Sequence, residues 1–226
     1  MIVILYHSRH GSTAKIARVI NSYLEGKAYL MDLEAIEYEK LDCATTIVLG
    51  MPIYNGKLDE EMVSFIKCNQ PLLIPRHYSI YIVGLQASEF MSFVSAEFDY
   101  QLLKDVKVIA GLGGALYFPK LSLAERLSLS VFNKRYPIIP KAHDNTIYEN
   151  FNNEEIEIFA KKIAHLEATS RWAFFYLMIS PSLGAPAAFD SSVSICIAKA
   201  YLSETRQTTS PNVNERSAVS TLTETI

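Results

Sequence analysis

The fold of this chain is decided near its start by IVILYHSRHGST, residues 2–13. The first five of these residues are apolar or aromatic and mostly β-branched, which predicts a buried strand. A short turn with a single glycine, Gly11, follows, and an apolar helical pattern through Ile16, Val19 and Ile20 begins directly after it. A helix N-terminus behind such a turn leaves backbone N–H groups without internal partners, and the helix dipole adds partial positive charge. The sequence therefore predicts an anion site at residues 8–13.

The residues of this turn suit a single terminal phosphate. They are Ser8, Arg9, His10, Gly11, Ser12 and Thr13. The hydroxyl groups can donate to an anion, and the glycine lets the backbone curl around it. The turn lacks the lysine of a Walker loop and the glycine pair of a dinucleotide loop. The alternative is an ordinary helix cap, in which Ser12 or Thr13 satisfies the first turn of the helix.

Composition and charge narrow the class of protein. A chain of 226 residues, 50% of them hydrophobic, can bury one α/β core. Its net charge of −3 gives no general attraction to nucleic acid. Its three cysteines, Cys43, Cys68 and Cys196, lie far apart, so we expect reduced thiols of a cytosolic protein rather than a disulfide or zinc framework. The first apolar run is too short for a secretory signal, and we expect none.

Strand and helix patterns alternate along the chain. Strands are predicted at residues 2–6, 28–31, 46–50, 79–85 and 106–111, and helices at about 12–24, from 58, 93–103 and 153–166. This order predicts an α/β fold, a doubly wound parallel sheet of five strands with helices on both faces. Such sheets bind ligands at the carboxyl ends of their strands.

Two further loops are expected at that edge, beside the phosphate-type turn. One contains Met51, Pro52, Ile53, Tyr54, Asn55 and Gly56, and the other contains Leu85, Gln86, Ala87 and Ser88. Apolar and aromatic side chains on a loop rim are costly unless they cover something flat, such as a ring system. We therefore expect Met51, Ile53 and Tyr54 at the rim of a cofactor site. The alternative is a Tyr54 ring that folds back on the sheet edge.

In this order, these residues resemble the flavodoxin family, which holds FMN phosphate on a Ser/Thr-x-Thr-Gly-x-Thr loop after the first strand. Ser8, Gly11 and Thr13 match that loop, and His10 stands where the family usually has threonine. The resemblance implies a strand order of 2-1-3-4-5, FMN phosphate on residues 8–13 and the isoalloxazine ring between residues 51–56 and 85–88. A histidine at position 10 can donate to the phosphate or point into solvent.

A narrower resemblance, to menaquinone-dependent protoporphyrinogen oxidases, comes from an insertion between the fifth strand and the last helix. It begins IAGLGGALYFPK, residues 109–120, and continues into an apolar helix with basic flanks. The resemblance implies oxidation of protoporphyrinogen IX to protoporphyrin IX in heme biosynthesis, with a quinone as electron acceptor. It also implies a cytoplasmic protein, peripheral on the inner membrane. On the substrate or quinone side it implies Tyr117, Lys120, Arg126, Lys141 and His143.

The insertion helix, residues 121–135, is apolar over more than half of its circumference. Such a helix either packs on the domain or lies against a membrane surface or a quinone. Its own sequence is compatible with both.

No catalytic acid–base pair and no metal-ligand spacing is recognisable, which agrees with a cofactor that performs the chemistry. We expect a domain at residues 1–168, with the insertion at about 117–147, and a tail at 169–226. The tail is apolar at 172–179, too short to span a membrane, and is expected to be disordered after Ser203. The alternatives to an enzyme are an FMN electron carrier that serves a protein partner and a binding module that has lost its flavin.

Overall fold

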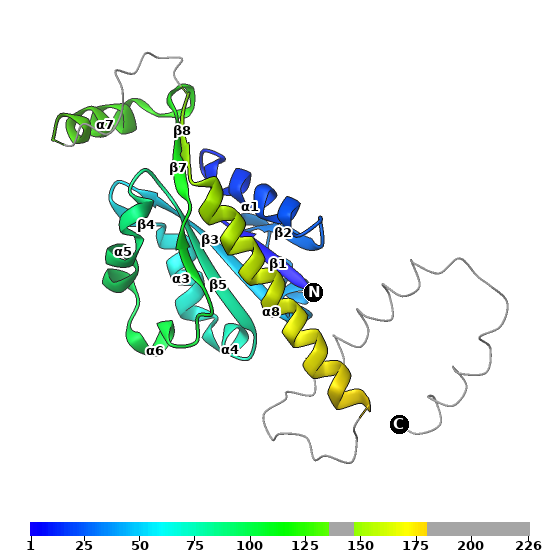
Figure 1. Ribbon diagram of the computed structural model, residues 1–226. Helices are drawn as coiled ribbons and strands as arrows, with labels where there is room; N and C mark the ends of the chain where they lie inside the picture. The colour runs from blue at the N-terminus through cyan, green and yellow to red at the C-terminus, as the bar shows by residue number, and fades with distance from the viewer. Residues whose placement is uncertain (136–146, 180–226) are drawn as a thin grey trace. The chain divides into compact units, whose positions relative to one another are not determined.

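A five-stranded parallel sheet forms the centre of the computed structural model, which describes residues 1–135 and 147–179 (Figure 1). All described residues belong to one compact unit, which lies within Met1–Ala185. The parallel strands lie in the order β2-β1-β3-β5-β6, which confirms the predicted order of first to fifth strand. Their bounds are β1 Ile2–Tyr6, β2 Ala28–Asp32, β3 Thr46–Tyr54, β5 His77–Val83 and β6 Ile109–Gly111.

Helices cover both faces of the sheet, as predicted. α1 (Ser12–Tyr23) and α8 (Asn153–Ile179) lie side by side on one face (Figure 1). The other face carries α2 (Tyr38–Asp42), α3 (Glu60–Cys68), α4 (Gln70–Leu73), α5 (Phe90–Glu97) and α6 (Tyr100–Leu103). Alternation along β1 explains the two layers, because Ile2 and Ile4 pack under α1 and α8 while Val3 and Leu5 pack on the opposite side.

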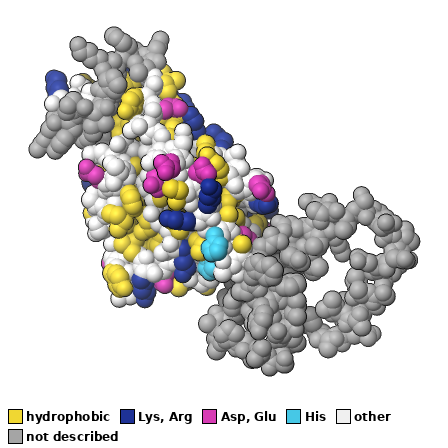
Figure 2. All heavy atoms as spheres, viewed as in Figure 1, with side chains coloured by type: hydrophobic (Ala, Val, Ile, Leu, Met, Phe, Trp, Pro, Cys, Tyr) yellow, Lys and Arg dark blue, Asp and Glu magenta, His cyan; other side chains and the backbone are white. Residues whose placement is uncertain are grey.

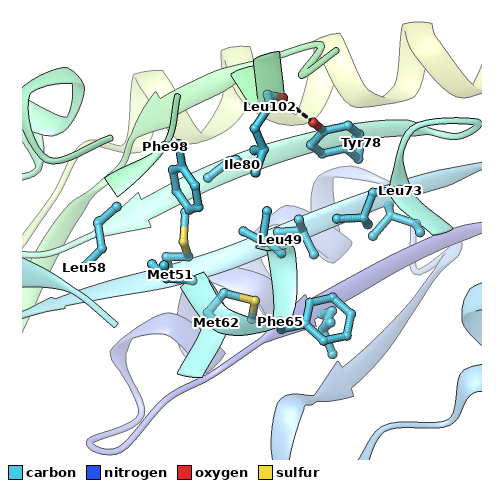
Figure 3. Packing of buried hydrophobic residues seen from close by; sticks show 14 of the residues in the cluster. Leu49, Met51, Leu58, Met62, Phe65, Leu73, Tyr78, Ile80, Phe98 and Leu102 are labelled. Carbon is cyan, nitrogen blue, oxygen red and sulfur yellow. Dashed lines mark hydrogen bonds between the residues drawn. The ribbon is translucent and has the colours of Figure 1, made fainter. Parts of the chain in front are cut away.

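The expected position of Met51 at a loop rim is wrong. Met51 is fully buried and packs in the cluster that contains Met62 and Phe98 (Figure 3), so it does not stand at a loop rim. The reason is that β3 continues to Tyr54 instead of ending at Gly50. Its last residues, Ile53 and Tyr54, pair with the short antiparallel strand β4 (Lys57–Leu58), which was not predicted.

The insertion is a hairpin with a helix at its end. β7 (Gly113–Tyr117) pairs antiparallel with β8 (Ile147–Phe151), and a short turn, η3 (Phe118–Lys120), leads from β7 into α7 (Leu123–Arg135). The hairpin projects beyond the carboxyl edge of the parallel sheet and carries α7 (Figure 1). The hairpin therefore begins at Gly113, inside the quoted stretch 109–120 and before the expected bound of about 117, and neither of its strands was predicted.

The last helix is longer than its predicted range of 153–166. α8 runs to Ile179, so the expected boundary between residues 168 and 169 falls inside it. The predicted disorder after Ser203 lies outside the described residues.

The face of the described chain shown in Figure 2 carries hydrophobic and charged side chains side by side. Acidic and basic side chains are interspersed on the face shown in Figure 2. Within residues 1–135 and 147–179, no helix has the length and apolar character needed to cross a membrane.

Candidate functional site

The phosphate-type turn is built as an anion cradle. Gly11 precedes the first residue of α1 with φ of 96°, a conformation that favours glycine, and no side chain caps the helix. Thr13 is fully buried, and its Oγ1 has no hydrogen-bond partner in the described part of the chain. An uncapped helix start beside an unpaired buried hydroxyl fits an anion and not the ordinary cap considered above.

Tyr54 reaches this turn from the end of β3. Its hydroxyl accepts a hydrogen bond from the Arg9 N–H at 3.0 Å, and the Arg9 guanidinium lies 5.0 Å from the centre of its ring. Burial raises the pKa of the Tyr54 hydroxyl, which therefore stays neutral. The ring thus packs on the turn rather than back on the sheet edge.

A buried pair, His7 and Asp59, connects the start of the phosphate-type turn to the start of α3. His7 Nδ1 lies 2.8 Å from Asp59 Oδ2, and both side chains are almost fully buried. The same carboxylate oxygen accepts the Met62 N–H at 3.1 Å, which makes Asp59 the cap of α3. This pair was not predicted from the sequence, because its members lie 52 positions apart.

The insertion closes over the turn. Glu125, in the first turn of α7, has its Oε1 2.9 Å from His10 Nε2, and Lys120 Nζ donates to the His10 carbonyl at 3.0 Å. Ser12 Oγ donates to the Ala115 carbonyl of β7 at 3.4 Å. Burial raises the pKa of Glu125, but hydrogen bonds from Ser122 and His10 outweigh it and lower that pKa, so the carboxyl is ionised near neutral pH. His10 is therefore engaged by the insertion and does not point freely into solvent.

A cavity of about 420 Å³ lies where the three loops and the insertion meet. This volume is within the range of small-molecule and cofactor sites. Nine of its lining residues were predicted from the sequence: His10, Ser12, Pro52, Ile53, Tyr54, Asn55, Gly56, Leu85 and Gln86. The residues that sequence reasoning missed are Val83, Gly84, Phe93, Ala115, Leu116, Leu121, Glu125, Ser128 and Leu129. Most of the missed residues come from the insertion, whose apolar helix is the signal that was available.

The other predicted residues do not line this cavity. Ser8, Arg9, Gly11 and Thr13 belong to the turn, where Ser8 Oγ accepts the Gly11 N–H at 3.1 Å. Ala87 is buried in the interior and Ser88 is exposed.

The residues predicted on the substrate or quinone side are placed differently from that expectation. The Tyr117 hydroxyl donates a hydrogen bond to Glu149 Oε1 at 2.9 Å. Burial is the main cause that raises the pKa of Tyr117 to about 12, and the Glu149 carboxylate is the second. Arg126 donates to the carbonyls of Phe118 and Leu121, so it supports the turn before α7 and does not line the cavity. Lys120 stands over the phosphate-type turn. Lys141 and His143 lie outside the described residues.

Comparison with known proteins identifies the family. The flavodoxin domain matches residues 3–135, more than half of the chain, and the chain belongs to that family. This agrees with the FMN cofactor expected from the sequence, because FMN is the cofactor of flavodoxin domains.

Solved structures with a similar fold share little sequence with this chain. Oxidised flavodoxin 2 from Bacillus cereus is 20% identical, with a TM-score of 0.45 over 73% of this chain and 97% of that one. A Fusobacterium nucleatum flavodoxin bound to flavin mononucleotide is 14% identical, with a TM-score of 0.37 over 49% of this chain and 69% of that one. Rubredoxin oxygen:oxidoreductase from Desulfovibrio gigas is 14% identical, with a TM-score of 0.42 over 74% of this chain. The chain spans only 36% of that protein's length. No curated protein matches the chain.

Proposed function

We propose that this protein is an FMN-dependent oxidoreductase that oxidises protoporphyrinogen IX to protoporphyrin IX and uses a quinone as electron acceptor. The observation that carries the proposal is that the insertion covers the predicted flavin site and forms a roof over it. Leu121, Glu125, Ser128 and Leu129 of the insertion line the same cavity as Tyr54. An enzyme needs a pocket beside its cofactor, whereas an electron carrier that docks with a protein partner leaves the cofactor edge open.

The residues at the turn fit the phosphate of FMN. The uncapped start of α1 offers backbone N–H groups, and Thr13 offers an unpaired buried hydroxyl. Tyr54 and the loop of Leu85 and Gln86 line the cavity on either side and are the candidates to hold the isoalloxazine ring. The two-electron redox chemistry would be supplied by bound FMN, and three rounds of it aromatise a porphyrinogen.

The walls of the cavity support an apolar substrate or acceptor. Phe93 from α5 and Leu121 and Leu129 from the insertion contribute much of its apolar lining. An apolar wall favours a macrocycle or a quinone, because burying such surfaces is favourable by about 25 cal/mol per Å². No side chain in the lining needs to be a nucleophile, since the redox chemistry would be supplied by bound FMN. Lys141 and His143, which the resemblance places on the substrate or quinone side, lie outside the described residues.

A peripheral membrane contact belongs to the same proposal. The outward face of α7 carries Leu123, Leu127 and Val131, which are 79%, 70% and 70% exposed. They recur at every fourth position and so form one apolar stripe. A stripe of this kind beside the cavity would bring the site to the bilayer, where a quinone is dissolved.

Two measurements test the catalytic proposal. The purified protein should bind FMN, seen as quenching of flavin fluorescence. The loaded protein should oxidise protoporphyrinogen without oxygen when a menaquinone analogue is added, seen as porphyrin fluorescence. Leu129→Ser should slow turnover at least several-fold and leave FMN binding intact, because Leu129 lines the cavity wall. Leu127→Ser, on the exposed face of the same helix, is the matched control in detergent.

The outcomes separate the alternatives. A loaded protein that oxidises no porphyrinogen but is rapidly reduced by a flavodoxin reductase is an electron carrier, and the proposal is then wrong. A protein that takes up no FMN is a binding module without flavin.

A further inference from the structure

Lys120 lies directly above the phosphate-type turn although it belongs to the insertion. Its Nζ donates to the His10 carbonyl at 3.0 Å. The same nitrogen is 3.4 Å from the position that a Cβ on Gly11 would take, so it stands over the glycine of the turn. The two residues that it covers are more than 100 positions away in sequence. The fold alone brings this cation to the cradle.

The other basic side chains at the turn already contact carboxylates. The Arg9 guanidinium is 3.7 Å from Asp59, and the His10 ring is 2.9 Å from Glu125. In the described part of the chain, Lys120 makes no ion pair with a carboxylate, and its ammonium lies 5.4 Å from the centre of the Tyr117 ring. A phosphate placed on the turn would therefore meet one cation whose charge is not already balanced.

The turn that carries Lys120 is held in place from within the insertion. Arg126 Nη2 donates to the Phe118 carbonyl at 3.0 Å, and Arg126 Nε donates to the Leu121 carbonyl at 3.1 Å. Ser122 and Glu125 form a capping box, in which the Ser122 N–H donates to Glu125 Oε2 at 2.8 Å. Glu125 then reaches His10 with its other oxygen. The position of Lys120 is therefore coupled to the helix that roofs the cavity.

We propose that Lys120 is a phosphate-binding residue of the FMN site, supplied by the insertion, and that FMN binding through Lys120 orders the cavity roof. The inference rests on the proposed function, because it assigns a residue to the cofactor that this function requires. The turn lacks the usual threonine hydroxyl at position 10, and Lys120 compensates by donating a charge-assisted hydrogen bond from above. Riboflavin has no phosphate, so it cannot use this contact.

Binding of FMN and of riboflavin tests the inference without an activity assay. The dissociation constants are measured by fluorescence quenching for the unaltered protein, Lys120→Ala, Lys120→Arg and the control Lys134→Ala. Lys134 is an exposed lysine on α7. We expect Lys120→Ala to weaken FMN binding about 10-fold or more, the loss for one charge-assisted hydrogen bond. Riboflavin binding should be unchanged, Lys120→Arg should restore most of the FMN affinity, and Lys134→Ala should match the unaltered protein.

Hydrogen exchange adds an independent readout. FMN should protect the backbone amides of residues 118–129 in the unaltered protein more strongly than riboflavin at equal saturation. In Lys120→Ala, FMN should protect them no more than riboflavin does.

Each result decides the matter. Equal FMN affinities of the unaltered protein and Lys120→Ala overturn this inference and leave the proposed function standing. Equal losses for FMN and riboflavin also overturn it, because Lys120 then acts on the cavity and not on the phosphate. An unaltered protein that binds no FMN overturns the proposed function together with this inference.

Discussion

The carboxylate of Asp59 makes two hydrogen bonds that belong to different loops. One joins it to Nδ1 of His7, the residue directly after β1, and the other comes from the Met62 N–H in the first turn of α3. The Asp59 N–H in turn donates to the Pro52 carbonyl at 3.0 Å. One side chain therefore sets the spacing between the phosphate-type turn and the hairpin that carries Tyr54.

We expect Asp59→Ala to lower the free energy of unfolding by about 2–4 kcal/mol. The loss combines a missing helix cap with a buried His7 Nδ1 left without its hydrogen-bond partner. Urea unfolding followed by far-ultraviolet circular dichroism measures it. Glu60→Ala, at the next and exposed position, is the control and should change stability by less than about 0.5 kcal/mol. Equal effects of the two variants would show that the His7–Asp59 pair does not stabilise the fold.

Among the elements, the β7–β8 hairpin decides whether the cofactor edge is open or roofed. β7 crosses the end of β5 at close range, where the Gly84 N–H donates to the Gly113 carbonyl at 2.9 Å. A Cβ at Gly114 would lie 2.4 Å from the Gly84 carbonyl carbon, so only glycine permits this crossing.

Gly114→Ala should therefore displace the hairpin and loosen the roof. The backbone of Gly84 cannot yield as a flexible side chain would, and we expect a loss of about 1–3 kcal/mol in the free energy of unfolding. Amides of residues 113–117 should exchange faster with deuterium. Ile147→Ala on the paired strand is the control, because Ile147 is 60% exposed. Unaltered exchange in Gly114→Ala would contradict the tight crossing.

The elements differ in how well the sequence predicts them. β1, β3 and β5 lie in long β-branched runs, which are typical of strands buried on both faces. β7 and β8 contain Gly113, Gly114 and Asn150, which disfavour strands, and only their mutual pairing forms them. α8 was expected to be shorter, because the apolar residues 172–179 were interpreted as part of a separate tail.

At the scale of the whole molecule, the cavity combines four separate parts of the chain. The phosphate-type turn, the end of β3, the loop after β5 and the insertion all meet at the carboxyl edge of the sheet. α7 then presents one side to this cavity through Leu129 and the opposite stripe of Leu123, Leu127 and Val131 outward. α7 therefore has apolar groups on two sides, one facing the cavity and one available to contact a second apolar surface.

We expect the protein to float with vesicles of phosphatidylethanolamine and phosphatidylglycerol. The combined variant Leu123→Ser, Leu127→Ser and Val131→Ser should lose most of this association, because each exposed side chain loses roughly 1.5–3 kcal/mol of burial. FMN binding should persist in that variant. Met91→Ser with Tyr100→Ser, which changes two exposed side chains elsewhere, is the control. An unaltered protein that does not float contradicts the membrane contact and leaves the FMN proposal in place.

The sequence by itself determined the parallel sheet and the location of the phosphate-type turn, which follow from local patterns: β-branched runs, amphipathic helices and one glycine before a helix. The strand order was expected only from the resemblance to flavodoxins, and the structure confirms it. Only the tertiary structure decided that His7 pairs with Asp59, that Glu125 reaches His10 and that Lys120 covers Gly11. These contacts join residues separated by 52, 115 and about 110 positions, and no local preference encodes them. They form because the carboxyl ends of parallel strands meet at one edge, and because the insertion folds back over that edge.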